Sequence, residues 1–278
     1  MNRLDPVSAG ASPDVDPAAA WSRLVEERAA QIGGARPPDF WDRRAAAYRT
    51  ATEGEGEADP FLAFMEPFCR PRLSLIDVGA GAGRHTTPLA ARLDWVTAVE
   101  PSQGMRESIP LLDNVTIVAS TWEDAEVAVA DLVICCHVLY SIREPIPFIE
   151  KLEMSARERV FVQMRDGQLR HPAERIWEEL SRRPRSPQPE FGDLCRLLRR
   201  LGVEPELAWL RRPLRQRFSS LEQALEDCRL RVGDSWDETV GRAWLEAHLE
   251  PDGGDALVHR GGEMVSGVAH WEPRTPSA

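Results

Sequence analysis

The sequence predicts an α/β fold built on a mostly parallel sheet, and three observations support this prediction. Short apolar segments alternate with amphipathic segments between residues 73 and 164, as they do in βαβ units. The apolar segments are nearly continuous, which is typical of parallel strands that are covered on both faces. A glycine-rich stretch at 79–83 follows the first of them and precedes a helical segment.

Helices are expected before the sheet. Residues 18–32 and a segment that begins near Asp39 carry apolar residues at helical spacing, which predicts two helices. Asp59 precedes Pro60, and this pair predicts the N-cap and first position of a third helix that runs to about Cys69.

The strands and helices of the sheet follow in alternation. Strands are predicted at 73–78, 96–99, 115–119, 130–136 and 159–164. Helices are predicted at 85–93, 102–109 and 146–154. Because a helix separates most successive strands, these strands should be parallel and joined by right-handed crossovers.

Helical segments dominate beyond residue 165. Helices are predicted at 171–183, 190–201 and 219–249, and strands at 206–211 and 264–271. The expected organisation is a disordered leader over 1–17 and a single domain over 18–272, which comprises an N-terminal helical lid (18–70), a cofactor-binding core (71–165), a helical cap with a sixth strand (166–262) and a last strand (263–272). Tryptophans of the cap can form a pocket or its core. We expect its many arginines to lie mostly on solvated helix faces, and binding of an anionic substrate or RNA is the alternative.

Composition excludes several classes of function. The 278 residues carry a formal net charge of −11, which disfavours nucleic-acid partners because these bind basic surfaces. No apolar run approaches the length of a membrane span, and residues 1–17 lack the features of a secretory signal, so we expect a cytoplasmic protein. The five cysteines form no CxxC and the histidines no HxxxH, so we expect neither a disulfide framework nor a metal site.

The stretch DVGAGAG at 77–83 carries the strongest functional signal. Glycines allow a tight turn and the close approach of a ligand to the backbone. A dinucleotide-binding loop would need glycine where Arg84 stands, and a phosphate-binding P-loop would need a following GK[ST]. Asp77 disfavours a pyrophosphate and suits a ligand with a cationic amino group, such as a sulfonium amino acid attached to adenosine. The residues expected to line this turn are Asp77, Gly79, Ala80, Gly81 and Gly83.

Acidic residues also follow the next two predicted strands. Glu100 can accept two hydrogen bonds from a ribose diol, and the helix that begins at Ser102 should lie beside the adenosine. Asp124 can accept a hydrogen bond from an adenine amino group, with Trp122 or Glu123 flanking the ring. The glycine turn and both acids fall at the carboxyl ends of three successive strands, where open α/β sheets bind ligands.

These motifs resemble those of class I S-adenosylmethionine (SAM)-dependent methyltransferases of the small-molecule type. The similarity extends over roughly residues 38–272, and its most specific stretches are LIDVGAGAGRHTTPLA, VEPSQGM and ADLVICCHVLYSI. FWDRRAAAY at 40–48 resembles the family segment that folds over the cofactor, and FGDLCRLLRRLGVEPELAWL resembles the helix and sixth strand near its C-terminus. The resemblance implies a Rossmann-like seven-stranded sheet with helices on both faces and an antiparallel last strand, at GGEMVSGVAHWEP.

The resemblance also implies SAM as cofactor and a small-molecule acceptor that is methylated on an O, N or C atom. Asp77 and the three glycines would line the methionine part, Glu100 would hold the ribose and Met105 would touch adenine. Other residues expected along the cofactor are Trp41, Tyr48, Pro101, Ser102, Trp122, Glu123, Asp124 and His137. No NPPY-type motif follows the fourth strand, which disfavours DNA bases and glutamine amides as acceptors.

Methyl transfer mainly requires alignment of donor and acceptor, so the lack of a catalytic motif is compatible with this activity. His137 is the best candidate for a general base because histidine suits proton transfer near neutral pH, with a packing role as the alternative. Arg165 is placed to bind an acidic acceptor or to form a surface ion pair. Two other functions stay open: an NAD-type oxidoreductase, which Arg84 and Asp77 disfavour, and a SAM-binding module without catalysis.

Overall fold

A computed structural model describes residues 16–34, 37–52 and 59–274. The predicted leader over 1–17 lies outside the described residues except at its end, where Asp16 caps a helix that begins at Pro17. No span of the described chain forms a helix long and apolar enough to cross a membrane. Within the same ranges, His, Cys, Asp and Glu side chains gather in no group of three that could hold a metal ion.

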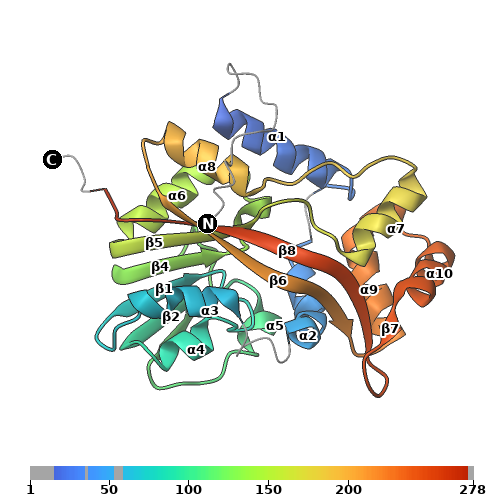
Figure 1. Cartoon of the computed structure of the whole chain (residues 1–278), viewed down its shortest axis with the longest axis horizontal. Helices are drawn as coiled ribbons and strands as arrows, with labels where there is room; N and C mark the ends of the chain where they lie inside the picture. The colour runs from blue at the N-terminus through green and yellow to red at the C-terminus, as the bar shows by residue number, and fades with distance from the viewer. Residues whose placement is uncertain (1–15, 35–36, 53–58, 275–278) are drawn as a thin grey trace.

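The core of the molecule is one mixed sheet with the strand order β3-β2-β1-β4-β5-β8-β6 (Figure 1). Its strands are β1 (Ser74–Val78), β2 (Trp95–Val99), β3 (Val115–Val118), β4 (Ala130–Cys136), β5 (Ala156–Arg165), β6 (Glu206–Phe218), β7 (Glu250–Pro251) and β8 (Leu257–Trp271). The first five strands pair in parallel, whereas β8 runs antiparallel to both β5 and β6. The predicted seven-stranded sheet with an antiparallel last strand is therefore confirmed, and the short β7 pairs with β8 as an eighth strand.

Strands β6 and β8 are much longer than predicted. The expected strand at 206–211 extends to Phe218, and the expected strand at 264–271 begins at Leu257. The additional residues pair with one another beyond a bulge at Pro213 and form a two-stranded ribbon outside the main sheet. Because this ribbon is rich in arginine and contains a proline, it lacks the apolar pattern by which strands are recognised in sequence.

The helices follow the predicted order. They are α1 (Pro17–Ala30), α2 (Phe40–Thr52), α3 (Pro60–Met65), α4 (Thr86–Ala90), α5 (Gln103–Arg106), α6 (Pro145–Met154), α7 (Pro172–Ser181), α8 (Phe191–Arg200), α9 (Leu221–Val232) and α10 (Glu238–His248). The single helical segment expected over 219–249 is wrong, because the chain breaks at Gly233, which has a φ of 74°. A Cβ atom there would lie 2.6 Å from the carbonyl oxygen of Ile32, so this contact requires glycine.

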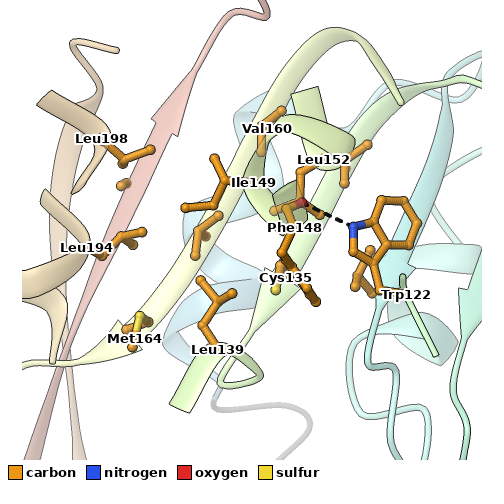
Figure 2. Packing of buried hydrophobic residues seen from close by; sticks show 14 of the residues in the cluster. Trp122, Cys135, Leu139, Phe148, Ile149, Leu152, Val160, Met164, Leu194 and Leu198 are labelled. Carbon is orange, nitrogen blue, oxygen red and sulfur yellow. Dashed lines mark hydrogen bonds between the residues drawn. The ribbon is translucent and has the colours of Figure 1, made fainter. Parts of the chain in front are cut away.

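Helices cover both faces of the sheet, as predicted. On one face α1, α6 and α8 pack over β4, β5 and β8 (Figure 1). Figure 2 shows part of this core, in which Phe148, Ile149 and Leu152 of α6 meet the strands. On the other face α3 and α4 bury Phe61, Met65 and Leu89 against the strands. The two apolar layers fix the edge at which the strands end, and the candidate site lies at that edge.

A second, smaller core holds the cap together. Helices α7, α9 and α10 gather around the far ends of β6 and β8 (Figure 1). The buried members of this cluster are Ala173, Ile176, Trp177, Phe218, Ala224, Leu225, Cys228, Val232 and Leu245. Trp236 and Trp244 pack against it from its rim, whereas Trp209 lies on β6 and is 39% exposed. The tryptophans therefore serve mainly as core and do not line one common pocket.

A buried ion cluster joins the lid helix α2 to the cap. The Asp227 carboxylate of α9 accepts hydrogen bonds from Arg44 Nε of α2 at 2.7 Å and from Arg231 Nε at 3.0 Å. His171 Nε2, at the start of α7, lies 3.1 Å from the same carboxylate. Burial lowers the pKa of His171 to about 4, so its ring is neutral near pH 7. Two buried guanidinium groups therefore share one carboxylate.

Replacing Asp227 with asparagine should destabilise the protein strongly. The variant Asp227→Asn would leave Arg44 and Arg231 without their counter-charge, and Arg44 is only 2% exposed. Removing one partner of a buried ion pair typically costs about 3–5 kcal/mol. We expect a loss of this size in the free energy of unfolding, measured by urea denaturation.

The neighbouring variant Glu226→Gln is the matched control. Its carboxylate pairs with Arg43 and Arg229 at the surface and its side chain is 40% exposed. Exposed pairs of this kind change stability by about 0.5 kcal/mol or less. Equal effects of the two substitutions would refute the structural role given to Asp227.

Candidate cofactor and acceptor site

The turn after β1 is a glycine bend whose backbone excludes other residues. Gly79, Gly81 and Gly83 have φ values of 69°, 57° and 80°, a region that L-residues with a Cβ seldom adopt. The amide groups of Gly79 and Ala80 both donate to the carbonyl oxygen of Val99, at 2.8 and 3.1 Å. A Cβ on Gly79 would lie 2.4 Å from a methyl group of Val138. The bend is therefore pressed between the ends of β2 and β4.

Asp77 places a buried carboxylate beneath this bend. The residue is 2% exposed, and the Thr86 hydroxyl donates to its Oδ2 at 2.7 Å. Burial raises the pKa of the Asp77 carboxyl group. Asp77 makes no ion pair with any described residue, and a buried carboxylate gains stability from a cationic partner. The site is therefore suited to a ligand with an amino group.

Glu100 lies at the end of β2, beside the bend. The Gly81 amide donates to its Oε2 and the Ser102 amide to its Oε1, both at 2.8 Å. Burial raises the pKa of this carboxyl group, which is 6% exposed. Each carboxylate oxygen has a further lone pair and can accept a second hydrogen bond. Glu100 is thus held rigidly in a position where a diol can bind it.

Helix α2 covers this region through Asp42, a residue that the sequence analysis missed. Asp42 Oδ1 accepts hydrogen bonds from the Ser102 hydroxyl at 2.6 Å and from the Gly104 amide at 2.8 Å. The ring of Tyr48 lies 3.9 Å from the position that a Cβ on Gly81 would take. The predicted closeness of Tyr48 to the bend is therefore present. Asp42 gave only a weak signal, because an acid in the first turn of a helix is usually explained by the helix dipole.

In the turn after β3, the Trp122 side chain is buried in the core, whereas the sequence predicted that it flanks the adenine ring. Its indole is 3% exposed, packs on Phe148 and donates to the Phe148 carbonyl oxygen at 3.3 Å (Figure 2). Since the ring is part of the core, it offers no face on which adenine could stack. Glu123 and Asp124 are exposed, and Asp124 Oδ2 accepts a hydrogen bond from the Thr121 hydroxyl at 2.9 Å.

Three further residues predicted to contact the cofactor differ in their exposure to solvent. Met105 of α5 is 2% exposed and lies behind the Ser102 cap, whose hydroxyl accepts a hydrogen bond from the Met105 amide at 3.2 Å. Pro101 is exposed. Trp41, in the first turn of α2, is 38% exposed and stacks edge-on with Phe40.

His137, directly after β4, has a strained backbone and a neutral ring. Its φ is 61°, and its amide donates to the Gln163 carbonyl oxygen at 2.9 Å. The Tyr140 hydroxyl oxygen accepts the Arg165 amide at 2.7 Å and lies 2.8 Å from His137 Nδ1. In the tautomer whose ring proton resides on Nε2, the Tyr140 hydroxyl group donates to Nδ1. Burial, together with nearby cations such as Arg165, lowers the pKa of His137 well below its usual range.

Asp59 explains why Arg84 stands where a dinucleotide loop has glycine. The Asp59 carboxylate caps α3 through the Phe61 amide at 2.9 Å and accepts Arg84 Nε at 2.8 Å. His85 Nε2 lies 3.0 Å from the same oxygen as Arg84. Burial acts to raise the pKa of Asp59, but the interactions with His85 and Arg84 hold it well below its usual range. Arg84 therefore links the start of α4 to α3.

A cavity of about 510 Å³ lies next to the loop that follows β4. Its wall includes Tyr140 and Ser141 from that loop and Phe40 and Trp41 from α2. Most of the rest of the wall comes from α1, α7, α9 and the segment that precedes α8. A molecule in this cavity would contact the same loop as His137.

The tautomer of His137 is directly testable. At pH 7 we expect a neutral ring protonated at Nε2, because Nδ1 accepts the Tyr140 hydroxyl proton. Long-range ¹H–¹⁵N NMR of labelled protein would identify this tautomer, and the variant His137→Gln would assign the signal. The variant Tyr140→Phe should shift the tautomer populations. An imidazolium signal at pH 7 in the unmodified protein would contradict this assignment.

Comparison with known proteins agrees with this site. Residues 76–158 match the family model described as a methyltransferase domain. A candidate methyltransferase from Bacillus halodurans has 13% identity, with a TM-score of 0.52 over 78% of this chain and 100% of that chain. A candidate methyltransferase from an antibiotic biosynthesis pathway of Anabaena variabilis has 15% identity, with a TM-score of 0.50 over 74% of this chain and 94% of that one. No match is found among curated proteins.

The two structural likenesses show the fold, whereas the family match concerns the site itself. The matched segment contains Asp77, the glycine bend, Glu100 and the loop that carries His137 and Tyr140. The family match favours a methyltransferase over an NAD-type oxidoreductase. Residues 76–158 of this chain are thus similar to a methyltransferase domain, and the chain shares its fold with the two solved structures.

Proposed function

We propose that this protein transfers a methyl group from SAM to a small molecule that binds in the cavity beside Tyr140. One observation carries the proposal. Two buried carboxylates, Asp77 and Glu100, flank the glycine bend at the ends of adjacent strands, within the segment that matches the methyltransferase domain. Such a pair suits a ligand that brings an amino group and a ribose diol.

The residues around the bend fit the chemical groups of SAM. Asp77 would pair with the amino group of its methionine part, since this buried carboxylate makes no ion pair within the described residues. Glu100 would accept the ribose hydroxyls while it holds the Gly81 and Ser102 amides. The buried Met105 would support the adenine ring from α5, and the exposed Glu123 and Asp124 would lie toward its polar edge.

The protein would promote methyl transfer mainly by aligning SAM with the acceptor and by excluding water from the reacting atoms. When bound, SAM supplies an electrophilic methyl group, so that the carbon–sulfur bond breaks as the bond to the acceptor forms and the acceptor releases its proton. Asp42 holds α2 over the bend, which would shield the reacting atoms. Orientation of two reactants can supply about 7–11 kcal/mol of a barrier.

The proton path, where an acceptor requires one, would run through Tyr140. The hydroxyl oxygen of Tyr140 lies 2.8 Å from His137 Nδ1, and Tyr140 also lines the cavity. An acceptor proton would reach the imidazole of His137 by way of that hydroxyl group. This arrangement supports His137 as a base that acts indirectly.

The cavity supports a small-molecule acceptor. Its volume of about 510 Å³ falls within the range of roughly 300–1,000 Å³ that is typical of small-molecule sites. Residues 18–70 would act as the lid, 71–165 as the cofactor-binding core and 166–262 as the cap that completes the cavity. The net charge of −11 supports a small molecule over a nucleic acid.

Binding of S-adenosylhomocysteine (SAH), the demethylated product, tests the cofactor site. We expect calorimetry to show that Asp77→Asn and Glu100→Gln each weaken SAH binding more than tenfold. The first variant removes a charge partner, and the second leaves too few acceptors for both backbone amides and a diol. Circular dichroism would verify that both variants keep the fold.

The exposed acid Asp113 supplies a matched control, because Asp113→Asn changes the same charge away from the bend. Its SAH affinity should equal that of the unmodified protein. Unchanged affinity in both site variants, or tighter binding of NADH than of SAH, would refute the proposed cofactor site.

A further inference from the structure

Arg185 lines the cavity, and two nitrogens of its buried guanidinium group have no hydrogen-bond partner among the described residues. Its side chain is only 4% exposed, and it lies on the segment between α7 and α8. Nη2 donates to the Arg231 carbonyl oxygen at 2.8 Å. Nε and Nη1 are buried and have no hydrogen-bond partner among the described residues. Arg185 is therefore an exception among the arginines of the cap, most of which we expected on solvated helix faces.

The carboxylate closest to Arg185 is already engaged. Glu174 Oε2 lies 3.9 Å from Arg185 Nε, beyond hydrogen-bond distance, and the same oxygen accepts Arg28 Nη2 at 2.5 Å. Arg28 also binds the other oxygen of Glu174, at 2.6 Å. Glu178, which acts on Arg185 from farther away, pairs with Arg175 at 2.9 Å. Arg185 therefore lacks a carboxylate of its own.

The other cations that line the cavity each have a partner. Arg143 pairs with Glu26, Arg28 with Glu174, and Arg231 with Asp227. Asp227 must also neutralise the buried Arg44. The wall of the cavity and the ion cluster behind it thus carry an excess of positive charge, on a chain whose net charge is −11. An anion in the cavity would meet a favourable potential.

Arg185 is also held in place before any ligand arrives. Its guanidinium carbon lies 5.1 Å from the ring centroid of Trp177, a contact that stabilises the cation, and Trp177 is 1% exposed. A buried group with unmade hydrogen bonds is costly for the folded protein. A ligand carboxylate would accept those bonds, and little side-chain ordering would oppose its binding.

The wall of the cavity also includes aromatic and apolar side chains. Phe40, Trp41 and Tyr140 line it together with Ile32 and Leu230. The polar side chain Gln188 also lines the wall, and its Oε1 accepts Arg165 Nη2 at 3.0 Å. A matching ligand combines an apolar ring with one anionic group.

We infer that the methyl acceptor is a small carboxylic acid with an aromatic or other apolar ring, whose carboxylate binds Arg185 while its ring contacts Phe40, Trp41 and Tyr140. This inference rests on the proposed function, because it takes this cavity as the acceptor site. The carboxylate is a recognition group, and Arg185 is a specificity-determining residue.

The test compares matched acids and amides on the protein saturated with SAH. The probes are 3-phenylpropionate and 4-phenylbutyrate with their two primary amides, titrated by calorimetry. We expect at least one carboxylate to bind at least tenfold more tightly than its amide. The variant Arg185→Gln should reduce this preference to within about twofold, because both probes then meet a neutral group.

The control variant is Arg143→Gln, which changes a cation of the same cavity that is 69% exposed and paired with Glu26. It should keep the preference for the acid. The affinity for SAH should remain unchanged in both variants. A parallel loss of SAH affinity in Arg185→Gln would overturn the inference, because Arg185 would then bind the carboxylate of the cofactor.

The ratio of the affinities for acid and amide in the unmodified protein tests the inference even where Arg185→Gln does not fold. Equal affinities for acid and amide, or no saturable binding of either acid at 10 mM, would overturn the inference. Failure of the unmodified protein to bind SAH would refute the proposed function separately. A tenfold preference for the acid that depends on Arg185 would then still establish the anion site.

Discussion

The hydrogen bonds between the glycine bend and the end of β2 are the constraint on which the rest of the site depends. The amides of Gly79 and Ala80 share the Val99 carbonyl oxygen, and the Gly81 amide binds the Glu100 carboxylate. These bonds bring the chain so close to the β4 loop that Gly79 has no room for a Cβ. The same bonds orient Glu100 and place the bend above the buried Asp77. The backbone and its two carboxylates thus form one rigid unit.

Charge is distributed so that each side of the site suits a different ligand group. The sheet edge buries carboxylates, whereas the cap and the lid bury guanidinium groups. Since buried charges are stable only with partners, the two regions predict ligands of opposite local charge. The amino group of a cofactor would complement the first region, and an acidic acceptor would complement Arg185. The net charge of the protein is negative, so it does not indicate this local pattern of charges.

The lid helix α2 connects the two regions physically. Asp42 binds α2 to the segment after β2, while Arg44, two residues later, binds it to Asp227 of the cap. Phe40 and Trp41 of the same turn line the cavity beside Tyr140. One short segment therefore contacts the cofactor side, the cap and the cavity. Any displacement of α2 would change all three contacts, so cofactor and acceptor binding should be energetically linked.

The sequence by itself determined the five parallel strands, the glycine bend and the acids at the strand ends. These features rest on local signals, because buried parallel strands are continuously apolar and a bend with positive φ needs glycine. Only the tertiary structure decided the length of β6 and β8, the break at Gly233 and the burial of Trp122 and Arg185. Each of these depends on a partner elsewhere in the chain. The far ends of β6 and β8 pair with each other, and β7 pairs with β8. Gly233 meets Ile32, Trp122 packs on Phe148, and Arg185 donates to the Arg231 carbonyl oxygen. Residue type predicts average exposure, but whether a particular tryptophan or arginine is buried depends on which elements pack around it.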